Sequence, residues 1–483
     1  MPWLPVVGLA AVKVAVTMVF AGRYGWHGDE LYYLASARHM ELGYVDYPPV
    51  TPAIARLVQV VAPDSVVALR FPGILAGALV VVLAALIARE LGGGRRAQVL
   101  AALTVVISPV FLGGNFIFST VDFDQLVWAL LLWLVARVLA GRDPRLWLLA
   151  GLVLGIGLET KYTVAAPAVA LASGLLLTPA RRHLATRWPW LGAALAVALL
   201  VPNLWWQAGH GWDSVAYTLH HRGSTDGPVA YWLQQALLAV NPVLLPMVVA
   251  GAVWLWRSGT FRALAWTAIL VELLLFAVGG KAYYPAPVYP LLYAAGAVWL
   301  ERSVGSLLLR WAWVAAAAVI SLVLVPILLP VEPADVFARS GLWKSRADFA
   351  AMYGWPDLAH QVTAAYASLP PSDRQGAMVL ASNYSEAGAL DLYGPGLGLP
   401  RGAVVSPHLT YYYWAPGRMS PDVVIAVGYQ RQALQSLFAD VTRVGTISNA
   451  YGVGNGEAGM PIFVCRSPRR PLWQAWPSLK LLD

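Results

Sequence analysis

The sequence predicts an α-helical protein that crosses a membrane many times and ends in a small α/β domain. Of its 483 residues, 59% are hydrophobic and only 12% are charged, whereas soluble globular proteins carry about 25% charged residues. Inside lipid, only helices and closed barrels satisfy the hydrogen-bonding groups of the backbone. Continuous uncharged runs favour helices over alternating strands. Runs that exceed the roughly 18 residues needed to cross a bilayer as a helix occupy 97–121, 189–208, 227–256 and 311–331.

The apolar segments divide into about eleven predicted transmembrane helices. Two charges lie deep inside them. We expect Lys13 to extend its ammonium to the membrane surface, and Glu272 to point into the bundle because exposure to lipid costs about 2.5–3.5 kcal/mol. The predicted ranges are 5–21, 66–88, 97–114, 125–140, 146–159, 162–179, 189–207, 238–256, 263–279, 284–300 and 311–330.

Basic residues gather in alternate loops of this predicted bundle. One set of loops holds 13 of the 21 Lys and Arg residues in 1–331 with only three acids, whereas the other set holds seven basic residues and ten acids. Loops on the cytoplasmic side carry the positive excess. We therefore expect a multi-pass membrane protein with its N-terminus in the cytoplasm. The formal charge of +8 is explained by this orientation signal, so nucleic acid is not an expected partner.

The composition changes at about Pro330, where ordinary charge density begins. Residues 332–483 hold 12 basic and 11 acidic residues. Residues 357–369 have the pattern of an amphipathic helix, and 377–383 and 422–428 have the pattern of buried strands that end in turn residues. We therefore predict two units: a transmembrane domain over 1–331 and an extracytoplasmic α/β domain over 332–483.

The first predicted outer loop carries the most unusual polar residues. The stretch GWHGDELYY places Asp29 and Glu30 side by side among aromatic residues, directly after the first apolar segment. Asp46 and Tyr47 follow in the same loop. Adjacent carboxylates aid neither membrane insertion nor core packing. We therefore expect a functional role for Asp29 and Glu30, whereas Asp46, taken alone, is better explained as a solvated or capping acid.

Four further outer loops contribute polar residues on the same predicted side of the membrane. Acids from the early loops can therefore face cations from the later ones. The cations suit phosphate, and a carboxylate suits a general base for an acceptor hydroxyl. Each lysine can also be a simple anchor for a helix end. The residues are Asp122 and Asp124, then Lys161 and Tyr162, then His221 and Arg222, and finally Lys281, Tyr283 and Tyr284.

These motifs resemble the GT-C superfamily of membrane glycosyltransferases, in particular the bacterial branch related to protein O-mannosyltransferases and lipid A aminoarabinose transferases. The resemblance rests on DELYYLASARHMELGYVDYPPVTPAIARL, STVDFDQLVWALLLWLVARVL, GLETKYTVAAP and GKAYYPAPVYPLLYAAGA, and on a tail segment that begins FAAMYGWPDLAH. Their order and spacing cover most of the chain. The resemblance implies a GT-C-like fold, a sugar donor linked to a polyprenyl phosphate, and transfer with inversion on the extracytoplasmic face.

The resemblance also implies roles for individual residues. Asp29 is the expected catalytic base, with Glu30 supporting the acceptor or the loop. Asp46 and either Asp122 or Asp124 are expected to contact the sugar or order the site. Lys161 and Lys281 are expected to hold the donor phosphate. The remaining donor-site candidates are Tyr47 (where relatives more often have His), Tyr162, His221, Arg222, Tyr283 and Tyr284.

Alternatives remain open from the sequence. The chain could instead transport or flip a lipid-linked saccharide, or serve as a non-catalytic cell-envelope assembly protein. The acceptor could be a lipid, a glycan or a protein. Some relatives bind a divalent metal, but the sequence shows no clear ligand set, and no cofactor is predicted with certainty.

Overall fold

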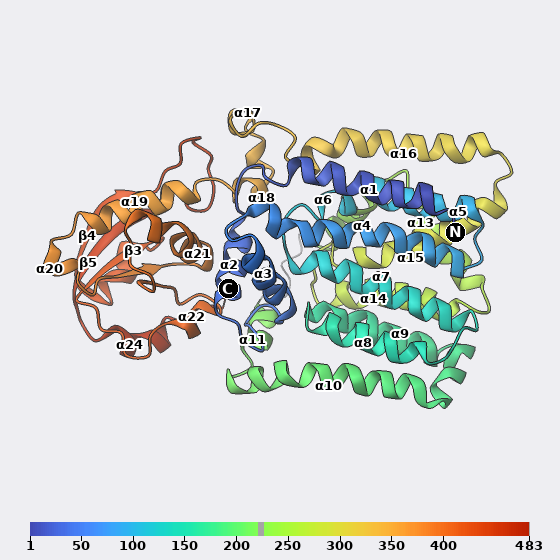
Figure 1. Cartoon of the computed structure of the whole chain (residues 1–483), viewed down its shortest axis with the longest axis horizontal. Helices are drawn as coiled ribbons and strands as arrows, with labels where there is room; N and C mark the ends of the chain where they lie inside the picture. Colours follow the sequence, from blue (N-terminus) through green and yellow to red (C-terminus); the bar gives the residue numbers. More distant parts are fainter. Residues whose placement is uncertain (221–226, 483) are drawn as a thin grey trace.

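A helical bundle and a smaller sheet-containing unit make up the protein, and they pack end to end (Figure 1). The computed structural model describes residues 1–220 and 227–482, with the side chain of residue 238 left out. A helix lies over each of the eleven predicted spans. The long helices are α1 (Trp3–Phe20), α4 (Val66–Glu90), α5 (Arg95–Ile107), α7 (Thr120–Leu139), α8 (Leu146–Leu158), α9 (Ala165–Leu176), α10 (Arg187–Gly209), α13 (Leu245–Arg257), α14 (Arg262–Ala277), α15 (Tyr289–Ser303) and α16 (Leu307–Leu328).

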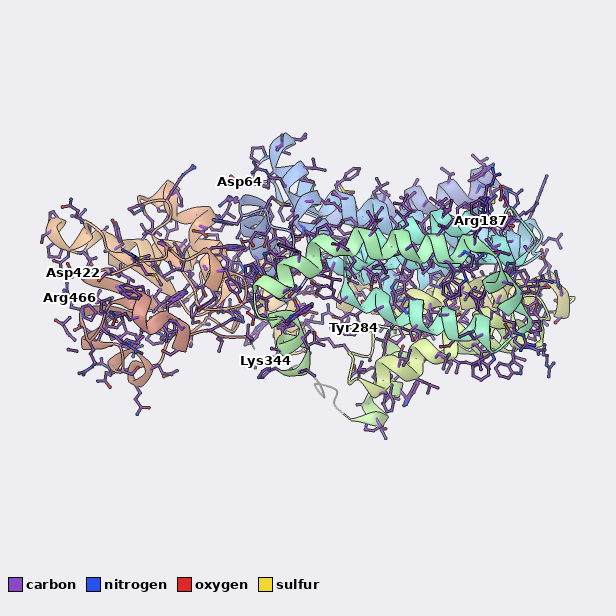
Figure 2. The ribbon with its side chains drawn as sticks, turned by 90° about the horizontal axis from the view of Figure 1, so that it is seen from below. Asp64, Arg187, Tyr284, Lys344, Asp422 and Arg466 are labelled. Carbon is purple, nitrogen blue, oxygen red and sulfur yellow. The ribbon has the colours of Figure 1, made fainter. Side chains whose placement is uncertain are left out.

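Four of these helices are long and apolar enough to cross a membrane by length and composition: α1, α4, α10 and α16. A fifth span is added if the bent pair formed by 162–176 and 179–185 is counted as one. The bundle is thus that of a membrane protein, and the number of eleven spans stays a prediction. Arg187, at the start of α10, lies at the end of the bundle far from the C-terminal unit (Figure 2).

Small residues let neighbouring helices approach closely. A Cβ atom at Gly151 of α8 would lie 2.1 Å from the carbonyl oxygen of Gly192 in α10, and one at Gly251 of α13 would lie 2.2 Å from that of Leu292 in α15. Such contacts stabilise helix pairs in lipid, where no hydrophobic force drives them together.

The loop after α1 forms two short helices, α2 (Gly28–Arg38) and α3 (Val50–Val61), at the junction between the bundle and the C-terminal unit (Figure 1). One side of α3 exposes Leu57, Val60 and Val61 at 69–85% of their surface. An apolar face of this kind fits a helix that lies along a membrane surface. Shorter helices in the same region are α6 (Pro109–Gly113), α11 (Asp213–His220) and α12 (Pro228–Gln234).

The C-terminal unit is built on a five-stranded sheet of order β2-β1-β3-β5-β4. The first three strands are parallel, and β5 runs antiparallel to both of its neighbours. The predicted strands and helix correspond to β1, β3 and α19. The elements are β1 (Met378–Ala381), β2 (Val404–Val405), β3 (Val423–Val427), β4 (Phe438–Thr446) and β5 (Pro461–Pro468), with α17 (Ala334–Ser340), α18 (Ala347–Ala350), α19 (Trp355–Ala367) and α21 (Tyr384–Tyr393).

One hydrophobic core joins the first loop to this sheet. Leu31 of α2 and Ile425 of β3 belong to the same buried cluster. A Cβ atom at Gly388 of α21 would lie 2.9 Å from the Leu31 side chain, so α2 and α21 touch at their backbones. The predicted boundary at 331/332 follows the end of α16 closely, but the loop helices of the first unit pack as part of the second.

The two charges predicted deep inside the spans, Lys13 and Glu272, both have hydrogen-bond partners within the bundle. Lys13 is only 2% exposed and donates to the carbonyl oxygen of Phe111. The expectation that Lys13 reaches the membrane surface is therefore wrong, because a buried carbonyl acceptor lies within its reach. Glu272 accepts a hydrogen bond of 2.9 Å from the Gln235 side chain, which points it into the bundle as predicted.

Candidate active site

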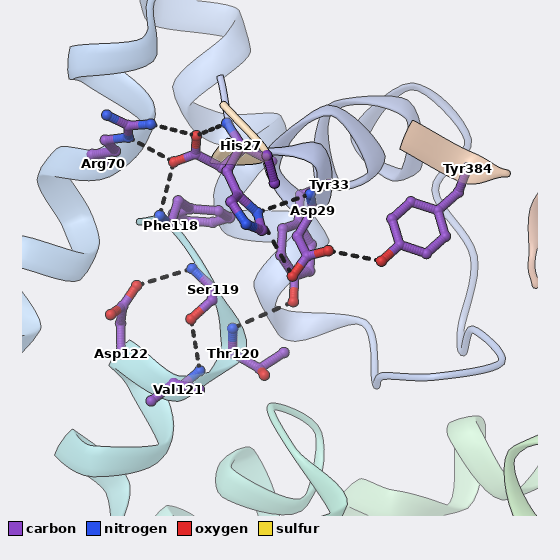
Figure 3. A network of polar contacts seen from close by, with 12 residues as sticks. His27, Asp29, Tyr33, Arg70, Phe118, Ser119, Thr120, Val121, Asp122 and Tyr384 are labelled. Carbon is purple, nitrogen blue, oxygen red and sulfur yellow. Dashed lines mark hydrogen bonds and ion pairs between the residues drawn. The ribbon is translucent and has the colours of Figure 1, made fainter. Parts of the chain in front are cut away.

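The N-terminus of α2 separates the two adjacent acids. His27 caps the helix: its Nδ1 accepts from the Asp29 N–H at 3.1 Å, while the Glu30 carboxylate accepts from the His27 N–H at 2.8 Å. Consecutive helical residues point about 100° apart. The Asp29 side chain is 49% exposed, and that of Glu30 is fully buried. Figure 3 shows Asp29 directed toward Tyr384 and the buried network on the side of Arg70.

Glu30 is held in a buried ion pair. Arg70 of α4 donates to both carboxylate oxygens, each at 2.7 Å, and the Phe118 N–H donates to the same carboxylate at 2.9 Å. Arg70 also donates to the carbonyls of Ala21 and Gly25 at 2.7 Å. The pair therefore joins α1, α2, α4 and the segment before α7. This placement favours the loop-supporting role for Glu30 over contact with an acceptor.

The C-terminal unit supplies a hydrogen bond to Asp29. The Tyr384 hydroxyl donates to Asp29 Oδ1 at 2.8 Å. The Tyr384 ring stacks between Tyr32 at 4.6 Å and His408 at 4.9 Å. Burial, followed by the nearby Asp29 charge, raises the pKa of Tyr384 well above its usual value, so the phenol remains a donor. The Asp29 carboxylate is thus fixed in position with half of its surface accessible.

Asp46 lies within electrostatic reach of Asp29. It accepts from the Tyr32 hydroxyl at 3.1 Å. Burial raises the pKa of Asp46 to about 7, and the Asp29 charge adds to that effect. Tyr47, the next residue, is 4% exposed, shares a hydrogen bond of 2.7 Å with Ser36 and packs against other tyrosines. Asp46 therefore lies near enough to Asp29 to be affected by its charge. Tyr47 is part of the buried core rather than of the accessible site.

The two acids at the start of α7 have different surroundings. Asp122 completes the capping box of α7 by accepting from the Ser119 N–H at 2.9 Å, and it also accepts from Asn115. Asp124 accepts from the Trp128 indole at 2.7 Å and from the Thr163 hydroxyl at 3.4 Å. Asp122 therefore serves the helix end, whereas Asp124 faces the segment that carries Lys161.

The two predicted phosphate-binding lysines lie near each other. Lys161 Nζ is 4.7 Å from the centre of the Tyr284 ring. Burial lowers the pKa of Lys161, Asp124 raises it, and the charge of Lys281 lowers it. Lys281 itself is exposed. Among residues 1–220 and 227–482, no hydrogen bond or ion pair holds either ammonium group, so both are free to bind an anion.

Two tyrosines connect the acid side of the site to the cation side. Burial, Tyr284 and Asp29, in that order, raise the pKa of Tyr283. Burial, Asp46, Tyr284 and Asp29 raise the pKa of Tyr217 in α11. Both phenols therefore lie within electrostatic reach of the Asp29 carboxylate and of Tyr284, whose ring contacts Lys161. Figure 2 shows Tyr284 on the side of the bundle that faces the C-terminal unit.

Three predicted site residues remain: Tyr162, His221 and Arg222. The Tyr162 hydroxyl donates to Asn203 at 3.0 Å and accepts from Gln207 at 2.9 Å, so it ties this loop to α10. His221 and Arg222 lie outside the described residues. Within the described part of the chain, no group of three or more His, Cys, Asp or Glu residues could hold a metal ion.

Sequence reasoning missed three residues of this region: Arg70, Tyr217 and Tyr384. Arg70 lies within a predicted span, where an arginine signals a buried partner, and that signal could have paired it with a loop acid. Tyr217 and Tyr384 carry no comparable signal, since tyrosines are common at membrane surfaces and in cores.

Comparisons with known proteins show which class of protein the chain resembles. Residues 46–206 match the family model described as dolichyl-phosphate-mannose-protein mannosyltransferase. That range contains Asp46, Asp122, Asp124 and Lys161. Together with the similarity of the whole fold to solved glycosyltransferases, the match confirms the resemblance to the GT-C membrane glycosyltransferases.

Individual relatives agree with this class. The chain is 30% identical over 196 residues to the lipid A galacturonosyltransferase RgtD of Rhizobium johnstonii, covering 39% of this chain and 40% of that protein. The chain thus matches about two fifths of the relative's length. ArnT from Cupriavidus metallidurans, solved bound to undecaprenyl phosphate, superposes with a TM-score of 0.59 at 15% identity, over 95% of this chain and 97% of ArnT. The Archaeoglobus fulgidus oligosaccharyltransferase, tethered to an acceptor peptide, gives 0.50 at 11% identity, over 80% and 63%.

Proposed function

We propose that this protein is an inverting glycosyltransferase of the bacterial inner membrane that uses a sugar linked to a polyprenyl phosphate. The observation that carries the proposal is the half-exposed Asp29, which Tyr384 positions. Tyr283 and Tyr217 lie within electrostatic reach of both Asp29 and Tyr284, and the Tyr284 ring contacts Lys161. No residue that the structure describes forms a hydrogen bond or an ion pair with the ammonium group of Lys161 or Lys281. That the structurally similar ArnT binds undecaprenyl phosphate supports a lipid-linked donor. The proposed acceptor is a hydroxyl or amine on the extracytoplasmic face.

In the proposed reaction, the acceptor attacks the anomeric carbon of the donor sugar from the side opposite the phosphate. The new bond joins the acceptor oxygen or nitrogen to that carbon, and the bond between the carbon and the phosphate oxygen breaks. Asp29 takes the acceptor proton. The electron pair leaves with the polyprenyl phosphate, whose charge Lys161 and Lys281 balance.

A single displacement needs one base rather than a pair of carboxylates that straddle the bond. Glu30 lies in the Arg70 pair and does not compete for this role. Asp46 and Asp124 are proposed to contact the sugar or order the lysines. The N-terminus is proposed to lie in the cytoplasm and the C-terminal unit outside, in agreement with the distribution of basic loops.

The test is sugar transfer by purified protein in lipid nanodiscs. A panel of polyprenyl-phosphate sugars is supplied with candidate lipid, glycan and peptide acceptors, and both glycosylated product and free polyprenyl phosphate are measured. Asp29→Asn should lower kcat by about 100-fold or more while donor binding persists. Equal turnover in wild type and Asp29→Asn would overturn the proposed base. Movement of the intact donor across the bilayer, unaffected by the substitution, would indicate a flippase instead.

A further inference from the structure

We propose that a cavity between the end of α2 and the C-terminal unit binds a saccharide portion of the acceptor, at a distance from Asp29. The acceptor role rests on the proposed function, whereas saccharide binding can be tested alone. The cavity has a volume of about 540 Å³, within the range of about 300–1,000 Å³ typical of small-molecule sites. Its lining includes Arg38 and His39 from the first loop and Asp391, Arg401 and Trp414 from the C-terminal unit.

A carboxylate in the lining of the cavity uses only one of its two oxygens within the described chain. The Tyr411 hydroxyl donates to Asp391 Oδ2 at 2.9 Å. Across the described ranges of the chain, no donor reaches the other oxygen of Asp391. Arg38 fixes the same residue through its backbone carbonyl at 3.2 Å. An ionised carboxylate only accepts hydrogen bonds, so the second oxygen suits the hydroxyl donors that a saccharide carries.

A guanidinium in the same lining offers hydrogen-bond donors. Arg401 is exposed, and in the part of the chain that the structure describes nothing forms a hydrogen bond or an ion pair with it. Its five N–H groups form a rigid fork. Such a fork can bind a pair of hydroxyl oxygens, or a carboxylate or phosphate carried on a sugar.

Stacked rings supply an apolar contact between these polar groups. The His39 ring lies 4.7 Å from the Trp414 ring at an interplanar angle of 15°. The Trp414 indole is fixed by donating to Glu41 at 3.0 Å, and the His39 side chain is exposed. The face of an aromatic ring attracts the weakly positive C–H bonds on the flat side of a sugar ring. Carboxylate, guanidinium and ring together favour a saccharide over a peptide or a simple anion.

The cavity and the proposed base lie at opposite ends of α2. Arg38 is nine residues beyond Asp29 in α2, which at ~1.5 Å per residue places their backbones about 13.5 Å apart. The residues that line the cavity do not include Asp29, Lys161 or Lys281. A saccharide bound here would therefore be a distal part of the acceptor rather than the sugar being transferred.

The experiment measures binding without turnover. The full chain in nanodiscs is titrated with defined neutral, uronic-acid and phosphorylated trisaccharides, followed by saturation-transfer NMR. We expect saturable binding of at least one class, weakened about tenfold or more by Asp391→Asn and by Arg401→Ala. The control Arg470→Ala, an exposed arginine elsewhere in the same unit, should bind as the wild type does. Thermal unfolding of each variant checks that it is folded. His39→Ala removes the ring stacked on Trp414 at an exposed position, and it should also weaken saccharide binding.

The outcomes separate this inference from the proposed function. Asp29→Asn should retain saccharide binding even though it loses transfer, so binding can succeed where the proposed function fails. No binding by any trisaccharide, or equal affinity in Asp391→Asn and Arg401→Ala, would overturn the saccharide site. Where transfer is measured, the cavity variants should raise KM for the acceptor, and a change confined to KM for the donor would refute the acceptor role.

Discussion

The hydroxyl of Tyr384 lies 2.8 Å from the Asp29 carboxylate, although 355 residues separate the two in the chain. Tyr384 belongs to the first turn of α21, and Asp29 to the first turn of α2. The ring of Tyr384 is held between Tyr32 and His408. The C-terminal unit therefore does more than cover the membrane bundle, because it fixes the orientation of the acid proposed to act as base.

Tyr384→Phe should lower kcat about 10- to 100-fold, because a hydrogen bond to a charged group contributes about 1.5–3 kcal/mol. The ring packing is retained, so the melting temperature should change little. Steady-state transfer kinetics and thermal unfolding check the two expectations. Tyr451→Phe, a half-exposed tyrosine in the same unit, is the matched control, and an equal loss in both variants would contradict the positioning role.

Glu30→Gln should destabilise the fold far more than Asp29→Asn. Removing one partner of a buried ion pair costs about 3–5 kcal/mol, and Arg70 would lose its only carboxylate among the described residues. Asp29 is half-exposed, so its amide variant should remain within about 0.5 kcal/mol of the wild type. Chemical denaturation in detergent measures both. Similar stabilities for the two variants would show that the Arg70 pair is not needed to hold the loop.

Lys281→Ala should weaken the binding of polyprenyl phosphate about tenfold or more, since a charge-assisted contact to phosphate is lost. Lys161→Met should act similarly while keeping the apolar contact with Tyr284. Lys344→Ala changes an exposed lysine of the C-terminal unit and serves as the control. Binding is measured by microscale thermophoresis in nanodiscs at two salt concentrations, and affinities that are equal in all three variants would exclude the lysines from the phosphate site.

The donor KM should rise as the pH increases through about 7. The pKa of Asp46 is raised to about 7, so this carboxyl is mainly neutral below that pH and becomes negatively charged above it. The added charge lies near Asp29 and repels an anionic donor. KM for the donor, measured between about pH 6 and pH 8, should therefore increase in the wild type and remain flat in Asp46→Asn. The same rise in Asp46→Asn would assign the effect to another group.

Much of the fold could be predicted because membrane helices appear in the sequence as long apolar runs. Uncharged runs and periodic basic loops located every long helix, and the patterns of 377–383 and 422–428 located β1 and β3. The strands β4 and β5 were not predicted. The exposed and buried residues of β4 alternate irregularly around the bulge between Arg443 and Gly445, which weakens the period of two that marks a strand. In β5, residues 462–465 form a continuous buried run, a pattern that does not by itself distinguish a strand from a buried helix.

The site could be predicted only in part, since side-chain direction depends on local helix geometry. The sequence singled out Asp29 and Glu30 together, but the capping box turned one carboxylate outward and the other into the core. The same logic separated Asp122, which caps α7, from Asp124, which faces the Lys161 segment. The contribution of Tyr384 depends on a long-range contact that no local pattern encodes.

The core that unites α2 with the sheet has a consequence for the order of synthesis. Leu31 is made early, whereas the strands it is buried with, through Val464, are made more than four hundred residues later. The loop that bears the proposed base cannot reach its final form until that distant segment has emerged and docked. A chain whose last strands are still being made would therefore lack the completed core that holds this loop.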